Sequence, residues 1–218
     1  MASNQLPKTK RNLIVSVMLI SAFVAILNQT LLNTDLPHIM RELKINENTS
    51  QWLITGFMLV NGVMIPLTAY LMDKVKTRPL YLAAMGTFLL GSIIAALAPN
   101  FGVLMTARVI QAMGAGLLMP LMQFTLFTLF SREHRGFAMG LAGLVIQFAP
   151  AIGPTFTGLI IDNASWRVPF IVIVGIALIA FIFGFISISS YNTTKDTKLD
   201  KRSVVYSTVG FGIMLYAF

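Results

Sequence analysis

The chain has 218 residues, of which 56% are hydrophobic and only 11% are charged. Soluble domains carry about a quarter charged residues, so this composition excludes an ordinary soluble fold and indicates a membrane protein. The formal net charge is +8, but the basic residues form short clusters between long uncharged stretches. That distribution is typical of a chain oriented across a bilayer, and we expect no nucleic-acid partner. Cysteine is absent, which excludes disulfides, thiolate metal sites and cysteine nucleophiles.

Long apolar runs predict the secondary structure. A helix needs about 20 mostly apolar residues to cross the hydrocarbon core of a bilayer. Such runs predict six helical spans, at Leu13–Leu32, Trp52–Leu71, Leu80–Leu97, Val103–Phe130, Phe137–Ile161 and Val168–Ile188. A seventh run begins near Val204 and is still apolar at Phe218, and we interpret this end as a truncation.

The loops between the spans indicate the orientation of the chain. With the N-terminus in the cytoplasm, the inner segments carry twelve basic residues, namely Lys8, Lys10, Arg11, Lys74, Lys76, Arg78, Arg132, Arg135, Lys195, Lys198, Lys201 and Arg202. The outer segments carry three, namely Arg41, Lys44 and Arg167. Because Lys and Arg are enriched in cytoplasmic loops, this bias predicts a cytoplasmic N-terminus. The expected organisation is a cytoplasmic tail at 1–12, a six-span bundle at 13–188, a cytoplasmic loop at 189–203 and the start of a seventh span at 204–218.

The fourth predicted span contains a charged residue, Arg108. A charge at membrane depth costs about 2.5–3.5 kcal/mol on insertion scales, so this residue is expected to have a specific role. Gln111 lies three residues further along, on the same helix face, and Gly114 and Gly116 would let a neighbouring helix approach closely. We favour an Arg108 that faces a water-filled cavity, where it binds substrate or controls a proton site. The alternative is that it links two helices through backbone carbonyls or an Asn.

Further polar residues lie in or beside the spans. Asn28 and Gln29, near the end of the first span, carry no titratable proton. Asp35 can titrate, but its place beside Pro37 predicts a hydrated residue at the outer rim. Asn61 lies inside the second span, where such a residue is more often a contact between helices than a ligand contact.

The fifth predicted span carries Pro150 and Pro154, each of which removes a backbone donor, so we expect the helix to bend. Ala149, Gly153 and Thr157 recur every four residues and form a narrow groove for a neighbouring helix. A bent and closely packed helix suits a protein that moves between two conformations, and a static kink is an equal alternative.

A charged loop separates the second and third spans. Asp73 lies there with Lys74, Lys76 and Arg78 around it. The acid can form a cytoplasmic ion pair that holds helices together, or it can be a solvated loop residue.

No motif of an enzyme, channel or metal site is present. The sequence contains no selectivity-filter run, no His-Glu-x-x-His pair and no Gly-x-Ser-x-Gly turn. His38 and His134 are expected in separate loops and give no metal signature. We therefore expect neither enzymatic activity nor a bound metal or cofactor.

Four segments in chain order resemble motifs of the major facilitator superfamily, and within it the fourteen-span drug:proton antiporters. Residues 69–78 are similar to the loop motif G-x-x-x-D-R/K-x-G-R-R/K. The segment keeps Asp73, Lys74 and Arg78, and it departs from the motif at Ala69, Lys76 and Thr77. Arg108-x-x-Gln111 resembles the fourth-span motif, to which the family ascribes a part in proton transfer.

The remaining resemblances lie around the last two spans and the first. Residues 149–158 are similar to the fifth-span antiporter motif, with Gly153-Pro154 and Gly158 in place. Residues 165–170 are similar to the outer loop before the sixth span. In the first span, Asn28 stands where many relatives have the acid of an L-D-x-T motif. This Asn-Gln-Thr run resembles a bacterial branch that includes lincomycin-resistance exporters.

The resemblance implies an all-α membrane protein whose six helices form two inverted three-helix repeats, paired with a C-terminal half in the bacterial cytoplasmic membrane. It implies export of amphipathic drug-like molecules by alternating access, driven by a proton gradient. For proton coupling and substrate contact it implicates Arg108, Gln111, Asn28, Gln29 and Asn61. For conformational change it implicates Asp73, Lys74, Arg78, Gly153, Pro154 and Gly158. The alternative is a truncated or accessory membrane fragment without transport of its own.

Overall fold

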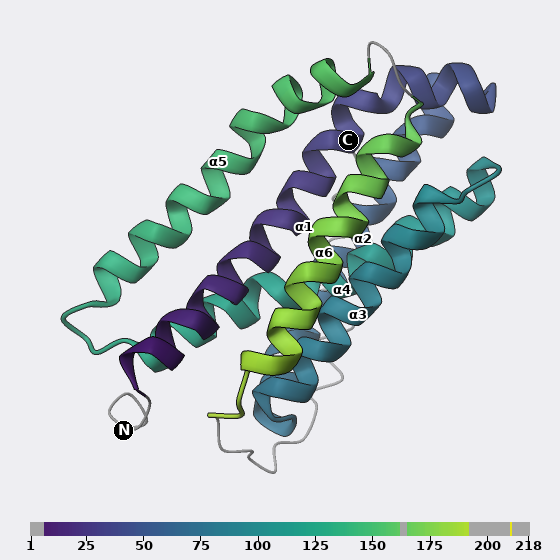
Figure 1. Cartoon of the computed structure of the whole chain (residues 1–218). Coiled ribbons are helices and arrows are strands. Elements are labelled where there is room, and N and C mark those ends of the chain that lie inside the picture. The colour runs from purple at the N-terminus through teal and green to yellow at the C-terminus, as the bar shows by residue number, and fades with distance from the viewer. Residues whose placement is uncertain (1–6, 162–164, 192–209, 211–218) are drawn as a thin grey trace.

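A computed structural model describes residues 7–161, 165–191 and 210, with only the backbone described for residues 156–161. It contains six helices, namely α1 (Lys8–Leu43), α2 (Glu47–Lys74), α3 (Thr77–Ala96), α4 (Phe101–Leu129), α5 (Arg135–Ile161) and α6 (Arg167–Ser187). The described residues form no strand, which confirms the all-α prediction (Figure 1). Most of the predicted loop at 189–203 and the predicted seventh span lie outside the described residues.

The first helix is longer than predicted. α1 has 36 residues and is therefore about 54 Å long, well beyond the roughly 30 Å hydrocarbon core. It continues through Pro37 because Leu36 and Ile39 are buried in a hydrophobic cluster that holds this part of the helix in place. Lys44 then ends the helix in a left-handed conformation (φ 54°). The prediction of a loop after Asp35 was therefore wrong, and His38 is a helix residue.

The other five spans agree with the prediction to within a few residues at each end. Two helices begin earlier than predicted, each after an asparagine cap: α2 by five residues and α4 by two. The side chain of Asn46 accepts a hydrogen bond from the backbone N–H of Thr49 at 2.8 Å, and Asn100 accepts one from Val103 at 3.0 Å. These caps satisfy backbone donors that have no partner within the helix, so α2 and α4 begin before the apolar run does.

The packing of the helices follows an inverted repeat. α1 packs on α5 and α6, whereas α4 packs on α2 and α3. If α1, α2 and α3 are exchanged for α4, α5 and α6, respectively, the first set of contacts becomes the second. The other main contacts, α1 with α4 and α3 with α6, are unchanged by this exchange. This is the arrangement predicted for two three-helix repeats related by a pseudo-two-fold axis. It makes α1 and α4 neighbours at the centre of the bundle.

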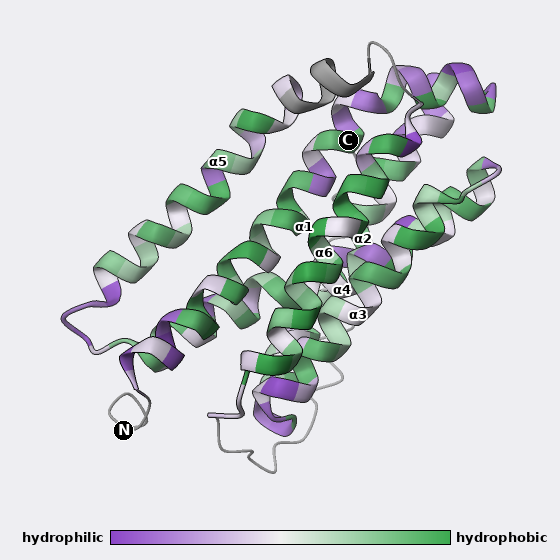
Figure 2. Ribbon diagram, in the orientation of Figure 1, coloured by the Kyte–Doolittle hydropathy of each residue, from purple (hydrophilic) through white to green (hydrophobic). Residues whose placement is uncertain are grey.

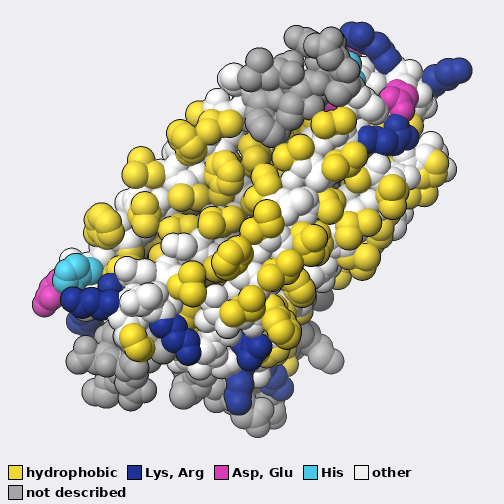
Figure 3. Space-filling model, in the orientation of Figure 1, with side chains coloured by type: hydrophobic (Ala, Val, Ile, Leu, Met, Phe, Trp, Pro, Cys, Tyr) yellow, Lys and Arg dark blue, Asp and Glu magenta, His cyan; other side chains and the backbone are white. Residues whose placement is uncertain are grey.

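The surface is apolar along the middle of the molecule and basic at its ends. Figure 2 shows hydrophobic residues along every helix, and Figure 3 shows apolar side chains over the middle of the visible face with Lys and Arg gathered at both ends. All six helices are long and apolar enough to cross a membrane. On α6, Ile179, Phe183 and Ile186 are each more than half exposed, which suits contact with lipid tails.

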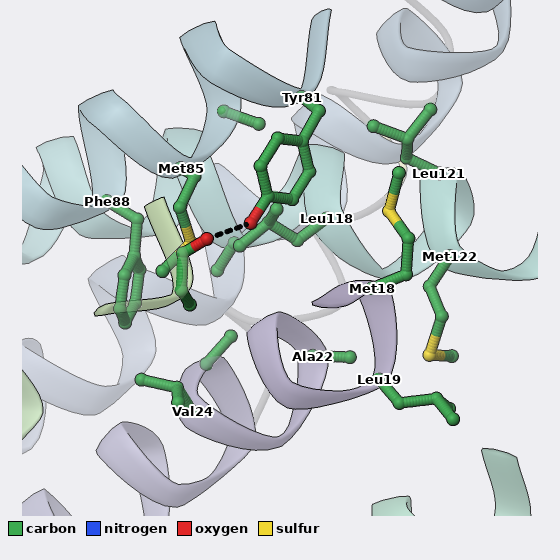
Figure 4. Packing of buried hydrophobic residues seen from close by; sticks show 14 of the residues in the cluster. Met18, Leu19, Ala22, Val24, Tyr81, Met85, Phe88, Leu118, Leu121 and Met122 are labelled. Atoms are coloured by element: carbon green, nitrogen blue, oxygen red, sulfur yellow. Dashed lines mark hydrogen bonds between the residues drawn. The ribbon is translucent and has the colours of Figure 1, made fainter. Parts of the chain in front are cut away.

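Buried side chains of α1, α3 and α4 pack together in the core, and Tyr81 of α3 forms a hydrogen bond there (Figure 4). The Tyr81 hydroxyl lies 2.8 Å from Ser21 Oγ and donates to the carbonyl oxygen of Ala180 at 3.0 Å. A Cβ atom at Gly184 would overlap the Tyr81 ring, so only glycine fits there. These contacts hold α3 and α6 together and thereby fix the bundle on which the central polar residues depend.

Candidate substrate and coupling site

Arg108 lies about two turns from the start of α4, with 0% of its surface exposed. Its Nε donates a hydrogen bond to the carbonyl oxygen of Leu53 in α2 at 3.3 Å, and Nη1 donates to Gln111 Oε1 at 2.9 Å. The guanidinium also stacks 4.1 Å from the centre of the Phe57 ring. These contacts partly compensate for burying the charge. The remaining nitrogen, Nη2, is buried without a hydrogen-bond partner.

Gln111 extends this polar chain to two further helices. Its Nε2 donates to Ser92 Oγ of α3 at 3.0 Å and lies 3.4 Å from Asn28 Oδ1 of α1. All three side chains are at most 1% exposed. Gly91 makes the approach of α3 possible, because a Cβ atom there would lie 2.7 Å from the backbone nitrogen of Gln111. Four helices therefore meet on one buried network formed by the side chains of Asn28, Ser92, Arg108 and Gln111 and the backbone carbonyl of Leu53.

The two interpretations of Arg108 can be compared with this geometry. In the conformation described, the residue is fully enclosed and links α4 to a backbone carbonyl of α2, as the alternative interpretation expects. It does not reach an open cavity in this conformation. Its unpartnered Nη2 nevertheless leaves one strong donor available if the helices rearrange. Its role in coupling or binding stays a prediction.

Gln29 and Asn61 lie at the more accessible part of the site. Both line an open depression between α1, α2 and α4 together with Ala25, Ile26, Phe57, Ala115 and Met119. Phe57 is shared with the buried network, because its ring forms part of this wall and also carries the Arg108 guanidinium. The depression thus offers two amides and an aromatic ring on an otherwise apolar wall, which suits an amphipathic ligand.

The charged residues between α2 and α3 make other contacts than the predicted ion pair. Arg78 donates from Nη2 to the carbonyl oxygen of Phe185 in α6 at 3.0 Å and stacks 5.3 Å from that ring. In the described part of the chain no ion pair joins Asp73 to Arg78. The Lys74 ammonium lies 5.5 Å from the centre of the Tyr70 ring. Arg78 therefore holds α3 against α6 in this conformation, and an ion pair involving Asp73 stays a prediction.

The predicted groove of α5 faces α1. Gly153 is buried, and a Cβ atom there would overlap the Thr30 side chain, whose Cβ would lie only 2.9 Å away. Ala149 is also fully buried, whereas Pro150 and Pro154 are exposed. Gly158 lies within α5, and its surroundings are outside the described side chains.

Asp35 departs most from the sequence prediction. The prediction of a hydrated rim residue was wrong, because Asp35 is 1% exposed. The continuation of α1 and the start of α6 cover it, and neither carboxyl oxygen has a hydrogen-bond partner. Sequence reasoning also missed Ser92 and Phe57, since a serine and a phenylalanine are unremarkable in apolar helices. The seven-residue spacing of Asn28 and Asp35 places both on one helix face, and this pattern could have indicated that Asp35 is buried as Asn28 is.

The described residues contain no group of three or more His, Asp or Glu side chains that could hold a metal ion. The polar network instead consists of amides, a hydroxyl and a guanidinium, which form hydrogen bonds but offer no set of anionic ligands.

Comparisons with known proteins agree with this architecture. A family model described as the Major Facilitator Superfamily matches residues 18–217. The chain is 52% identical over 208 residues to the uncharacterized MFS-type transporter YcnB of Bacillus subtilis, covering 95% of this chain and 44% of that protein. It is 40% identical over 201 residues to the lincomycin resistance protein LmrB of Bacillus subtilis, covering 92% of this chain and 42% of that protein. A crystal structure of the human organic anion transporter MFSD10 shares the fold with a TM-score of 0.74 at 15% identity, covering 93% of this chain and 54% of that one. The chain spans less than half the length of these curated relatives.

Proposed function

Because the chain belongs to the Major Facilitator Superfamily, we propose that it forms the N-terminal part of a proton-coupled exporter of amphipathic small molecules. The observation that carries the proposal is the buried network in which Arg108 and Gln111 connect α4 to α1, α2 and α3. A charge buried at the meeting point of four helices is costly, and transport proteins place such charges on ion and substrate pathways. The 40% identity to a lincomycin resistance protein supports a drug-like substrate.

In this proposal the depression lined by Gln29, Phe57 and Asn61 contacts the substrate. Movement of the Phe57 ring would uncover the Arg108 guanidinium behind it and offer its free Nη2 to an oxygen of the substrate or to a carboxylate. A substrate bound there changes the contacts that hold α1 to α4 together. Binding is thereby coupled to the relative positions of the helices, which is what alternating access requires.

The proposal includes a C-terminal half that closes the other side of the substrate site, as the partial coverage of the relatives supports. The protein would reside in the bacterial cytoplasmic membrane with a cytoplasmic N-terminus. A proton gradient, rather than a bound cofactor, would drive export. The close contact of Gly153 with Thr30 would let α5 move with α1 as one unit.

The test substitutes Arg108 in the complete transporter that carries this chain. Lysine keeps the charge but has no planar fork, so it cannot bind Leu53 O and Gln111 Oε1 together while stacking on Phe57. We expect Arg108→Lys and Arg108→Ala to reach near wild-type abundance and to lose most lincomycin efflux, and Gln111→Ala to show a milder loss. Arg132→Lys, at an exposed turn, is the matched control and should transport normally.

Membrane abundance by immunoblot and efflux of labelled lincomycin are measured in the same cells. Normal efflux in Arg108→Lys, or a loss that only follows abundance, would make Arg108 a structural link between α2 and α4 and would remove the main support for its role in coupling.

A further inference from the structure

A carboxyl group lies buried in the half of α1 that is expected to face outward. Asp35 is 1% exposed and lines a narrow crevice between α1 and α6, together with Asn28, Leu31, Leu32, Pro169, Phe170 and Ile173. Six of these seven lining residues carry no charge at any pH. Neither oxygen of the carboxyl accepts a hydrogen bond from the described residues.

An ionised carboxylate is costly in such surroundings. Removing it from water without donors costs several kcal/mol even after the protein relaxes. The group must therefore bind a proton or gain a donor from a rearrangement of the helices. Natural proteins keep a buried acid without a partner mainly where both the protonated and the ionised carboxyl serve the function. The Asp35 carboxyl thus has the properties of a site that is loaded and unloaded as the protein changes conformation.

His38 connects this carboxyl to water. It lies one turn further along α1, with Nδ1 3.6 Å from Asp35 Oδ1, and its side chain is 42% exposed. Nδ1 itself is buried and makes no hydrogen bond. The distance is slightly too long for a hydrogen bond, and a small rotation of either side chain would close it. An imidazole ring can both accept and donate a proton, so an accessible proton carrier lies beside a buried carboxyl.

Two of the other charged side chains near this end of α1 are already engaged, and Arg41 and Lys44 at the end of the helix are exposed. Glu42, one turn beyond His38, forms an ion pair with Arg167 at the start of α6. Arg108 of α4 is bound by a carbonyl of α2 and by its own helix. The side chains of α5 at 156–161 are outside the described part. Among the described residues, His38 is therefore the titratable group in direct reach of Asp35.

We propose that Asp35 is the proton-binding site of this N-terminal bundle and that His38 passes protons to it from the outer water. In the transfer, imidazolium Nδ1–H gives its proton to the ionised Asp35 Oδ1. The neutral imidazole then turns Nδ1 toward the outer water, takes a proton from hydronium there and turns back. The proposal rests on the proposed function as a proton-coupled exporter.

The crevice links this site to the central network. Asn28 lines its inner part, two turns from Asp35 and about 10.5 Å deeper along α1. Asn28 Oδ1 faces Gln111, while its Nδ2 is buried without an acceptor. When Asp35 releases its proton, the carboxylate needs a donor that the present packing of α1 and α6 does not supply. Deprotonation therefore favours a rearrangement of α1 against α6, and a movement of α1 also carries Asn28 and so disturbs the Asn28–Gln111 contact.

The first experiment detects the protonated carboxyl without requiring transport. Dicyclohexylcarbodiimide reacts with protonated carboxyls in apolar surroundings, and mass spectrometry locates the adduct. We expect Asp35 to be modified in membranes of the wild-type protein, less as the pH rises. Glu47, an exposed acid in the first turn of α2, is the control and should remain unmodified. An unmodified Asp35 across the pH range would overturn the proposal.

The second experiment separates proton coupling from substrate binding in proteoliposomes of the complete transporter. Asp35→Asn keeps the shape and removes the titratable proton, so we expect normal lincomycin counterflow but a loss of gradient-driven transport. Glutamine carries no titratable proton, so His38→Gln should keep counterflow, slow gradient-driven transport and shift the pH profile of its rate, and Glu47→Gln should match the wild type. Wild-type gradient-driven transport by Asp35→Asn would refute the proposal. Absence of lincomycin movement in the wild type, with Asp35 still modified by the carbodiimide, would instead count against the proposed exporter function.

Discussion

The contact between α3 and α4 supports the whole central network, and Gly114 controls it. A Cβ atom at this position would lie 2.5 Å from the carbonyl oxygen of Ala84, 2.6 Å from the backbone nitrogen of Phe88 and 2.8 Å from Phe88 Cβ. Comfortable contacts between such atoms are about 3.5–4.0 Å. Gly114→Ala must therefore push the two helices apart by about 1 Å, since the obstructing atoms belong mainly to the backbone and cannot rotate away.

The expected magnitude follows from two opposing effects. Overpacking a well-filled contact costs about 1–3 kcal/mol, and backbone obstruction places this site toward the upper end. Alanine is a better helix former than glycine by about 1 kcal/mol, which offsets part of the cost. We expect Gly114→Ala to lower the free energy of unfolding by about 1–2 kcal/mol, which for a chain of this size lowers Tm by roughly 2–8 °C. The same displacement should weaken the Gln111–Ser92 hydrogen bond, now 3.0 Å long, and reduce transport.

The assay is the fraction of protein that stays monodisperse in detergent after heating to a series of temperatures. Gly175→Ala is the matched control, because Gly175 lies in the interior of α6 and a Cβ atom there meets nothing within 4 Å. It should leave Tm unchanged or slightly raised. A Gly114→Ala protein as stable as the wild type, or a Gly175→Ala protein equally damaged, would refute the packing explanation.

Two further predictions concern topology and the contact between α1 and α5. The chain has no cysteine, so single cysteines at Asn48 and Pro99 should react with an impermeant thiol reagent in intact cells, whereas cysteines at Lys76 and Glu133 should not. The opposite pattern would reverse the proposed orientation. Gly153→Ala should insert normally but slow transport, because the new methyl group overlaps the Thr30 side chain, and Thr30→Ala in the same protein should partly restore the rate. Equal transport by the single and double variants would show that this contact does not limit the conformational change.

The sequence alone determined the six helices and their places along the chain. Each span is predicted by an apolar run of its own, because a helix satisfies its backbone hydrogen bonds within the segment and needs no distant partner. The shared face of Arg108 and Gln111 also follows from local spacing, and their hydrogen bond of 2.9 Å agrees with it. Likewise, the resemblance to the major facilitator superfamily rested on short local motifs, and the family model over residues 18–217 confirms it.

The tertiary structure decided which polar groups are enclosed and what they contact. The partners of Arg108 and Gln111 in other helices lie 55 residues away at Leu53 and 83 residues away at Asn28, a separation that no local periodicity encodes. Arg78 contacts Phe185, 107 residues away, rather than the nearby Asp73. The burial of Asp35 also depends on a part of the chain that is distant in sequence, since the start of α6 covers this residue. Whether a side chain is enclosed depends on how several helices pack together. The sequence of one helix shows on which face a residue lies, but not which other helix covers that face.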